Sequence, residues 1–543
     1  MVEGLKKIAL GKNVYILLFA IGFLYTFPVF NKFWAPYDEG VITVAAQRLL
    51  AGEVPYKDFF ILMYPPGQIY LLAAIFKLFS SPLIAGRIYT VLISSGIALL
   101  TYCSTFLLTG RRIVAILSWA IVLLASAPRL GAIPAPIWPG IFLGLLTILL
   151  FTSRLKNLNC RHILCTGLCA GVTALFRHDI GIFAAASVLI TLLIKGMRET
   201  RHVFREGMVF VSGVLFVILP CAIYFIKISA MRDMYNSLIL FPLILFPSVH
   251  QGAAGLPFPG PCIDLNMIFH GSLHFIKVNQ FYIPVLVYLF CVIYLSRLVI
   301  KKRALDTSDQ MMFPFLLFGI FTFNQVRIRT DVMHLLTVIQ PAVILFGFMI
   351  HKTLSYKPGS RIKKMTLYIF TAAILFLFVL LSIKNADKYV KNSFRKVYKK
   401  DIIKTHFDVG TIYIPKDERR DVTDTVNFIK ENTHQKERIF IGNSEHWKDD
   451  FGGSTIIYLL ADRLPSTKFY ELVPGIQTSP EVQKEIKESI IRHNVLLLVL
   501  QDIDMVGLRR EDTHPDKLIL DDFIARHFKR AEKFGKYGIY IRR

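Results

Sequence analysis

Acidic residues are scarce in this sequence: 38 Asp and Glu stand against 63 Lys and Arg, which gives a net charge of +25 at pH 7. The seven cysteines lie mostly within or beside apolar runs, without CxxC spacing or a His pattern typical of zinc sites. We therefore infer neither a disulfide framework nor a metal cluster from them. The chain also lacks a GxxxxGK(S/T) phosphate loop and a GxSxG elbow, which argues against a nucleotide-driven pump and an α/β-hydrolase.

Apolar residues are abundant instead, because 54% of the 543 residues are hydrophobic and the mean hydropathy is +0.50. Such a composition is typical of membrane proteins, whose helices need about 20 apolar residues to cross about 30 Å of hydrocarbon. The first run follows three lysines and lacks a small-residue cleavage site, so we expect a retained anchor. About eleven spans are expected, at 14–33, 83–108, 113–130, 138–153, 163–177, 179–195, 207–228, 279–299, 312–326, 332–350 and 365–384.

Basic residues gather in short clusters between the apolar runs and form no continuous aromatic-lined patch, so we expect no nucleic-acid partner. By the positive-inside rule, these clusters lie on the cytoplasmic side of a cell membrane. They occur at 111–112, 154–161, 195–205, 297–303 and 352–364. The remaining segments are then extracytoplasmic, namely 34–82, 131–137, 229–278, the junctions at 177–179 and 327–334, and the chain after 383.

Charges become dense after residue 383, which predicts a transmembrane domain at 1–384 and an extracytoplasmic soluble domain at 385–543. Alternating strand and helix signals in the second domain favour an α/β layer. Strands are expected at 438–442, 495–501 and 537–541, and helices at 421–432, 454–463, 479–493 and 519–530. The expected fold class is an α-helical polytopic membrane protein with a C-terminal soluble α/β domain. Within the bundle, "GLCAG" at 167–171 fits close helix packing.

Two adjacent carboxylates, Asp38 and Glu39, follow the first apolar run. The apolar spacing after them predicts a short amphipathic helix on the outer surface, ending at Gly52. One interpretation makes Asp38 the N-cap of this helix, with Glu39 favoured in the first turn by the helix dipole. The other makes Asp38 a base at the membrane surface, because one cap does not require two acids. The pattern alone leaves both open.

The same loop offers Asp58, and then Tyr64 before Pro65 and Pro66, which open a second helix. Proline suits the first helical turn and needs no functional explanation. Asp58 fits a solvated loop charge as well as a site residue. We keep Asp58 and Tyr64 as candidate substrate contacts.

Arg177, His178 and Asp179 interrupt otherwise continuous apolar sequence at 174–183. An Arg or Asp at the centre of a bilayer costs on the order of 2.5–3.5 kcal/mol, so such residues usually line a polar cavity. The alternative is an internal ion pair between Arg177 and Asp179 at a tight turn between helices. We favour a role in binding substrate.

A second polar junction lies at 324–341, where Arg327, Arg329, Asp331 and His334 separate two apolar runs on the same side. Guanidinium groups bind phosphate oxygens in a bidentate way. Either junction alone fits a turn at the membrane surface. Together, on the face that also carries Asp38 and Glu39, they predict one site for an anionic, lipid-linked substrate.

Three stretches in order carry a resemblance to a known family: "YDEGVITVAAQRLLAGEVPYKDF", then "YPPGQIYLLAAIFKLF", then "AGRIYTVLISS". Residues 14–100 resemble the GT-C superfamily of membrane glycosyltransferases, in particular family 39-like proteins related to protein O-mannosyltransferases and the aminoarabinose transferase of lipid A. The resemblance implies transfer of a sugar from a polyprenyl-phosphate carrier to an acceptor hydroxyl at the extracytoplasmic face. It also implies that Asp38 is the catalytic base and that Glu39 supports it.

The sequence departs from the lipid A transferases at Tyr64, where those proteins carry an acidic and a basic residue before the proline. No metal ligand is therefore carried over there, and participation of a divalent metal is left open. Compensation of the leaving phosphate by Arg177, Arg327 or Arg329 follows from the topology and not from the resemblance.

The resulting hypothesis is an inverting glycosyltransferase that uses a polyprenyl-phosphate sugar and a glycan, lipid or protein acceptor. Two alternatives stand beside it. A transporter or flippase of lipid-linked oligosaccharides would use intramembrane Arg and Asp along the substrate path. A ligase or polymerase of surface polysaccharide would use similar chemistry with an oligosaccharide donor.

Overall fold

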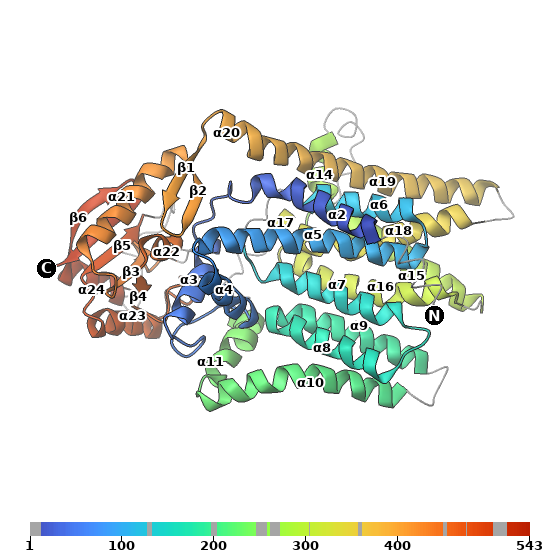
Figure 1. Ribbon diagram of the computed structural model, residues 1–543, viewed down its shortest axis with the longest axis horizontal. Helices are drawn as coiled ribbons and strands as arrows, with labels where there is room; N and C mark the ends of the chain where they lie inside the picture. The colour runs from blue at the N-terminus through green and yellow to red at the C-terminus, as the bar shows by residue number, and fades with distance from the viewer. Residues whose placement is uncertain are drawn as a thin grey trace.

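A bundle of long helices carries a smaller domain with a β-sheet at one of its ends (Figure 1). We call this end, where the short helices α3 (Asp38–Leu50) and α4 (Gly67–Leu78) also lie, the domain end. This computed structural model describes residues 12–126, 133–196, 203–245, 258–260, 272–302, 305–356, 361–448, 453–473, 475–502 and 518–543. The expected fold class, a polytopic helical protein with a C-terminal α/β domain, is confirmed.

Each run that the sequence predicts to span the membrane is occupied mainly by helix in its described residues. In the described residues, six helices are long and apolar enough to cross a membrane, or up to seven if the bent pair α17 and α18 is one span. The expected number of about eleven spans therefore stays a prediction. The helices are α2 (Lys12–Thr26) with η1 (Phe27–Val29), α5 (Pro82–Thr109), α6 (Arg112–Ser126), α7 (Ile137–Ser153), α8 (Cys160–Phe176), α9 (His178–Gly196), α10 (Val203–Lys227), α15 (Tyr282–Ile300), α16 (Thr307–Ile328), α17 (Val332–Val338), α18 (Gln340–Ser355) and α19 (Arg361–Val390).

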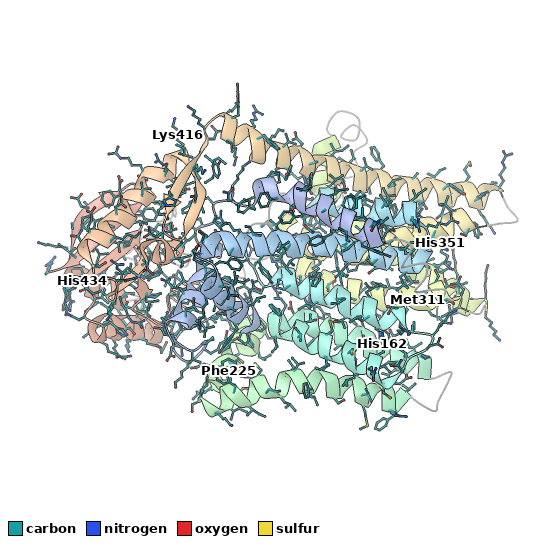
Figure 2. The ribbon with its side chains drawn as sticks, viewed as in Figure 1. His162, Phe225, Met311, His351, Lys416 and His434 are labelled. Carbon is teal, nitrogen blue, oxygen red and sulfur yellow. The ribbon has the colours of Figure 1, made fainter. Side chains whose placement is uncertain are left out.

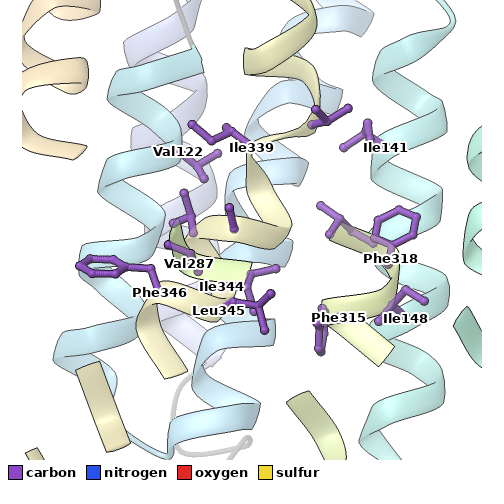
Figure 3. Close-up of a cluster of buried hydrophobic side chains, with 14 of the residues drawn as sticks. Val122, Ile141, Ile148, Val287, Phe315, Phe318, Ile339, Ile344, Leu345 and Phe346 are labelled. Atoms are coloured by element: carbon purple, nitrogen blue, oxygen red, sulfur yellow. The ribbon is translucent and has the colours of Figure 1, made fainter. Parts of the chain in front are cut away.

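Helix α18 lies at the centre of the bundle. Its residues from Gln340 to Met349 are all buried, as expected of a helix that is covered on every side. Figure 3 shows Ile344 and Phe346 of this helix beside Val287 of α15, and Val122 of α6 beside Ile339, the residue before the helix. Apolar side chains thus hold the bundle together along its length.

Glycines allow α8 and α10 to pack closely. A Cβ atom on Gly167 would lie 2.2 Å from the carbonyl oxygen of Phe210, and one on Gly213 would lie 2.7 Å from that of Leu164. Because backbones approach each other only where side chains are this small, the packing role predicted for "GLCAG" is confirmed.

The basic clusters lie at the end of the bundle away from the C-terminal domain. Figure 2 shows His162, Met311 and His351 near this end, whereas Phe225 and Lys416 lie near the other. There the side chain of Arg111 donates to Nδ1 of His351 at 3.2 Å. The one-sided distribution of charge expected from the sequence is therefore present in the fold.

Between α10 and α15 the structure describes α11 (Met231–Tyr235), η2 (Asn236–Leu245) and α14 (Ser272–Asn279). The proline- and glycine-rich loop expected across 229–278 lies largely outside the described residues, at 246–257 and 261–271. Helix α19 continues past the predicted domain boundary at 384/385, through η3 (Lys391–Arg395) and α20 (Lys396–Tyr398), into the C-terminal domain.

The C-terminal domain contains a five-stranded sheet in the order β4-β3-β5-β7-β6 and a separate hairpin of β1 and β2. Strand β3 pairs in parallel with β4 and β5, and β7 pairs antiparallel with β5 and β6. The strands are β1 (Ile402–Phe407), β2 (Gly410–Pro415), β3 (Arg438–Asn443), β4 (Leu464–Pro465), β5 (Leu497–Gln501), β6 (Phe528–Phe534) and β7 (Tyr537–Arg542). The helices are α21 (Lys416–Asn432), α22 (Ile456–Ala461), α23 (Pro480–Arg492) and α24 (Ile519–His527).

The three strands and four helices predicted for this domain are confirmed, with the largest changes of boundary at α21, which begins at Lys416 and not at 421, and at α24. The helix expected at 519–530 ends at His527, because Phe528 begins β6, whose pairing with β7 replaces helical hydrogen bonds. Strands β1, β2, β4 and β6 were not predicted. Of these, β4 has only two residues and β6 is largely exposed, so neither produces a strong apolar signal.

Helix α3 is buried against the C-terminal domain, and its predicted position at the outer surface of the membrane stays a prediction. A Cβ atom on Gly40 would lie 2.1 Å from the backbone nitrogen of Ile456, at the start of α22. The same nitrogen donates to the carbonyl of Pro36 at 3.0 Å, and the hydroxyl of Thr455 donates to that of Tyr37 at 3.0 Å. The first turn of α3 is thus fixed by the domain that covers it.

Arg48, near the other end of α3, strengthens this contact. Its guanidinium pairs with Glu53, donates to the carbonyl of Thr467 at 2.7 Å and lies over the ring of Tyr470 at 5.3 Å. Glu53 also binds Arg438 of β3 at 2.5 Å. Buried charges are retained where hydrogen bonds satisfy them, and here these bonds join the two domains.

Replacing Gly40 by alanine is expected to destabilise the docking of α3, by about 1–3 kcal/mol, because the new methyl group overlaps the backbone of α22. Thermal unfolding of the purified protein in detergent measures the effect. Gly207→Ala on α10 is the matched control, since nothing lies within 4 Å of a Cβ atom there. Equal melting temperatures for the two variants would contradict this account.

Candidate active site

A cavity of about 300 Å³ lies at the domain end, where α3, the start of α7, the end of α16 and the C-terminal domain meet. Its apolar lining includes Val41, Ile42, Trp138 and Met333. Its polar lining consists of Tyr37, Asp38, Tyr64, Arg177, Gln325, Arg329, Asp331, His334, Thr337 and Glu471. The structure therefore brings together six of the residues that the sequence predicted for one site: Asp38, Tyr64, Arg177, Arg329, Asp331 and His334.

Asp38 lies in the first turn of α3 with its side chain open to the cavity. Tyr37, and not Asp38, occupies the N-cap position, so the N-cap interpretation of Asp38 is wrong. Among the described residues, none donates a hydrogen bond to the Asp38 carboxylate. The surrounding protein raises the pKa of Asp38 by removing water from it, and the positive charge of Arg329 opposes this shift. A carboxylate with a raised pKa and no fixed donor is suited to accept a proton.

Glu39, the neighbouring acid, points away from the cavity. Its carboxylate receives two hydrogen bonds from Arg87 of α5, Nε at 2.7 Å and Nη2 at 2.6 Å, and both side chains are 1% exposed. Arg87 also donates to the carbonyl of Phe33 at 3.2 Å. The structure thus places the two predicted catalytic acids in different surroundings, Asp38 in the cavity and Glu39 in a buried ion pair with the helix bundle.

Arg177 lines one wall and is held by Asp179. Its Nε and Nη2 atoms donate to the two carboxylate oxygens of Asp179 at 2.9 and 2.7 Å. Gln325 of α16 also donates to Asp179, at 2.8 Å. Gly140 of α7 leaves room for this arrangement, because a Cβ atom there would lie 2.8 Å from the Arg177 side chain. The ion pair considered from the sequence is present, and it lies at the cavity.

Arg329 lines the cavity with a less constrained side chain, which is 51% exposed. Its Nε atom contacts a single oxygen of Asp331 at 3.0 Å. The other oxygen of Asp331 caps α17, accepting from the backbone nitrogen of His334 at 2.9 Å, and contacts Nδ1 of His334 at 2.9 Å. The junction at 327–334 therefore presents one mobile guanidinium beside an anchored acid and imidazole.

Besides Glu39, four of the predicted site residues do not line the cavity. Asp58 is exposed and accepts from the backbone nitrogen of Val54 at 2.7 Å, which fits the loop-charge interpretation. Arg327 donates to Asn324 at 2.9 Å on the exposed side of α16. Asp179 acts through Arg177. The fourth residue, His178, lies between Arg177 and Asp179 in the sequence but does not line the cavity.

Sequence reasoning missed several cavity residues, of which Glu471 of the C-terminal domain carries the most chemistry. This side chain is 5% exposed and receives hydrogen bonds from the hydroxyl of Tyr37 at 3.5 Å and from the backbone nitrogen of Leu62 at 3.3 Å. Burial raises the pKa of Glu471 to about 8, with the charge of Asp38 acting in the same direction. Burial likewise raises the pKa of Tyr64 to about 12, so its hydroxyl stays protonated. No motif marks Glu471, because only the docking of the domains brings it to the cavity.

A site for a divalent metal was left open by the sequence. In the part of the chain that the structure describes, no three His, Cys, Asp or Glu side chains are grouped closely enough to hold a metal ion. We therefore derive no step of the reaction through a metal.

No family model and no curated protein sequence matches the chain. Among solved structures, ArnT from Cupriavidus metallidurans bound to undecaprenyl phosphate is similar over 97% of this chain and 97% of its own, with a TM-score of 0.53 and 10% identity. The oligosaccharyltransferase AglB from Archaeoglobus fulgidus, in complex with an inhibitory peptide and a dolichol-phosphate, is similar over 90% of this chain and 69% of its own. Its TM-score is 0.50 and its identity 12%.

Both solved proteins are GT-C glycosyltransferases. At these identities the likeness concerns the fold, and it extends over nearly the whole chain, C-terminal domain included, in the case of ArnT. The protein is thus a polytopic membrane protein with the GT-C fold, as the resemblance of residues 14–100 predicted.

Glu39→Gln is expected to destabilise the protein by about 3–5 kcal/mol, because it leaves Arg87 buried and incompletely paired. Adding Arg87→Met, which removes the unpaired charge, is expected to restore part of this loss. Unfolding in detergent measures both changes. A Glu39→Gln protein that unfolds like the wild type would contradict the assignment of Glu39 to the scaffold.

Proposed function

We propose that this protein is a glycosyltransferase that moves a sugar from a polyprenyl-phosphate carrier to an acceptor hydroxyl at the extracytoplasmic face of a cell membrane, with Asp38 as general base. The observation that carries the proposal is the Asp38 carboxylate, which is open to a cavity that also contains Arg177 and Arg329. A base and two guanidinium groups in one cavity suit the deprotonation of a nucleophile and the binding of a leaving phosphate.

In the proposed reaction, Asp38 accepts the proton of the acceptor hydroxyl while the acceptor oxygen attacks the anomeric carbon of the sugar. The bond between that carbon and the phosphate oxygen breaks, and its electron pair leaves with the lipid phosphate. A single displacement of this kind inverts the configuration at the anomeric carbon. The raised pKa of Asp38 makes it a stronger base than an exposed aspartate.

Lipid phosphate is the donor group that fits the arginines best. The two GT-C structures similar to this chain were solved with undecaprenyl phosphate and with dolichol-phosphate, respectively. Arg329 has one contact with Asp331 and is half exposed, so it can turn toward a phosphate. Arg177 is held on two oxygens of Asp179, which keeps its charge at a fixed position in the wall.

The distribution of charge supports an extracytoplasmic position for the site. The basic clusters lie at one end of the bundle and the cavity lies at the other, with the C-terminal domain. Because basic loops stay in the cytoplasm, we place the cavity, Glu39 and the domain at 385–543 on the extracytoplasmic side. A site at one end of the bundle favours a transferase over a transporter, whose substrate path needs access from both faces.

Asp38→Asn is expected to lower sugar transfer about 10²–10⁴-fold, because the amide cannot accept the proton of the acceptor. The measurement is transfer of labelled sugar from a panel of polyprenyl-phosphate donors in membranes that contain equal amounts of wild-type or variant protein. Asp58→Asn makes the same change in the same loop outside the cavity and is expected to leave transfer unchanged. Full transfer by Asp38→Asn would remove the proposed base. Transfer only from an oligosaccharide donor would indicate a ligase.

Arg329→Gln is expected to weaken binding of undecaprenyl phosphate about 10–100-fold, through the loss of charge-assisted hydrogen bonds. Arg327→Gln is the matched control, because Arg327 lies two residues away and does not line the cavity. The dissociation constant of labelled undecaprenyl phosphate for the purified protein distinguishes them. Equal weakening by both substitutions would point to general electrostatic attraction and not to a phosphate site.

A further inference from the structure

Glu471 is a carboxyl group that the proposed reaction does not yet use. It lies between β4 and α23 of the C-terminal domain, and its side chain reaches the cavity that holds Asp38. Two contacts fix its orientation: Oε1 accepts from the hydroxyl of Tyr37 and Oε2 from the backbone nitrogen of Leu62. Both contacts come from residues 37–62, the segment that contains α3, so Glu471 joins the C-terminal domain to this segment.

The groups that face Glu471 are acidic or phenolic. Asp38 belongs to α3, Tyr37 and Tyr64 belong to the loops before α3 and α4, and Tyr470 precedes Glu471 in its own domain. Among the described residues, no Lys, Arg or His forms an ion pair with Glu471, whereas Arg177 and Arg329 are paired with aspartates. The hydrogen bonds from Tyr37 and Leu62 act to lower the pKa of Glu471, but burial and the charge of Asp38 outweigh them.

Asp38 and Glu471 line the same cavity but lie in different surroundings. Asp38 is open to the cavity, and the positive charge of Arg329 opposes the rise in its pKa that burial causes. Glu471 is buried, its pKa is raised to about 8, and it is mainly protonated at neutral pH. A neutral carboxylic acid can donate a hydrogen bond, whereas a carboxylate only accepts. Two acids whose surroundings shift their pKa values to different extents commonly have different roles in catalysis.

We propose that Glu471 binds the acceptor, donating a hydrogen bond from its protonated carboxyl group to an oxygen of the acceptor while Asp38 takes the proton of the reacting hydroxyl. This inference rests on the proposed glycosyltransferase function and extends it to the C-terminal domain, which contributes part of the acceptor site. The donor phosphate is bound elsewhere in the cavity, by the arginines of the bundle.

Two variants, Glu471→Gln and Glu471→Ala, distinguish hydrogen-bond donation to the acceptor from the other roles that a buried acid can have. Glutamine keeps a neutral hydrogen-bond donor of the same size, and alanine removes it. Labelled-sugar transfer into the acceptors of the membrane is measured with the donor that the wild type uses, from about pH 6 to about pH 10. Glu532→Gln and Glu532→Ala, on the exposed strand β6, are the controls.

Wild-type transfer is expected to fall as the pH rises through about 8, because ionised Glu471 no longer donates and repels Asp38. Glu471→Gln is expected to transfer like the wild type at neutral pH and to lose this alkaline decline. Glu471→Ala is expected to transfer about tenfold less at every pH, with the KM for the polyprenyl-phosphate donor unchanged. The Glu532 variants are expected to follow the wild type throughout.

Three results would overturn the inference while leaving the glycosyltransferase function intact. They are full transfer by Glu471→Ala, an inactive Glu471→Gln, which would mean that the charged form is required, and an alkaline decline that persists in Glu471→Gln. A change in the KM for the donor in either variant would move Glu471 to the donor site and also overturn it. A wild-type protein that transfers no sugar from any donor would instead refute the proposed function itself.

Discussion

The buried ion pair between Glu39 and Arg87 sets the direction in which α3 presents its first turn. Successive residues of a helix point about 100° apart, so a helix that turns Glu39 toward α5 necessarily turns Asp38 another way. That other direction is the cavity. The two adjacent acids therefore have different tasks. The ion pair of Glu39 with Arg87 anchors the helix, and this anchoring orients Asp38. Gly40 completes the arrangement by letting α22 approach closely enough to fix the same turn from the opposite side.

Because α3 is fixed between the bundle and the C-terminal domain, the cavity is lined by residues of both. The helix bundle contributes guanidinium groups, Arg177 and Arg329, and the C-terminal domain contributes the buried acid Glu471. In the proposed reaction, the phosphate of the carrier binds at the arginines and the acceptor binds beside Glu471, with Asp38 between them as the base.

Much of the bundle half of the site could be predicted from the sequence, because charged residues inside apolar runs are conspicuous. Arg177, Arg329, Asp331 and His334 were found in this way, and all four line the cavity. The sequence did not show which of Arg327 and Arg329 lines the cavity. Residues two positions apart at the end of a helix point in nearly opposite directions. Glu471 and Arg87 gave no signal. Their partners lie more than forty residues away, so only the folded arrangement of α3, α5 and the C-terminal domain reveals them.

The two arginines also differ in the contacts that their aspartate partners would keep if the arginine turned toward a phosphate in the proposed reaction. If Arg329 turns toward the phosphate, Asp331 keeps the backbone nitrogen and the imidazole of His334, so no buried charge is left unpaired. If Arg177 did so, Asp179 would lose its only cationic hydrogen-bond donor among the described contacts and would keep the bonds from Gln325 and from the backbone of Ile180, at a higher cost in desolvated charge. In the proposed reaction, Arg329 is therefore the residue suited to turn toward the phosphate, and Arg177 is the charge that stays in place. Such a division would let the proposed site bind and release a lipid phosphate without disturbing the helix ends that form it.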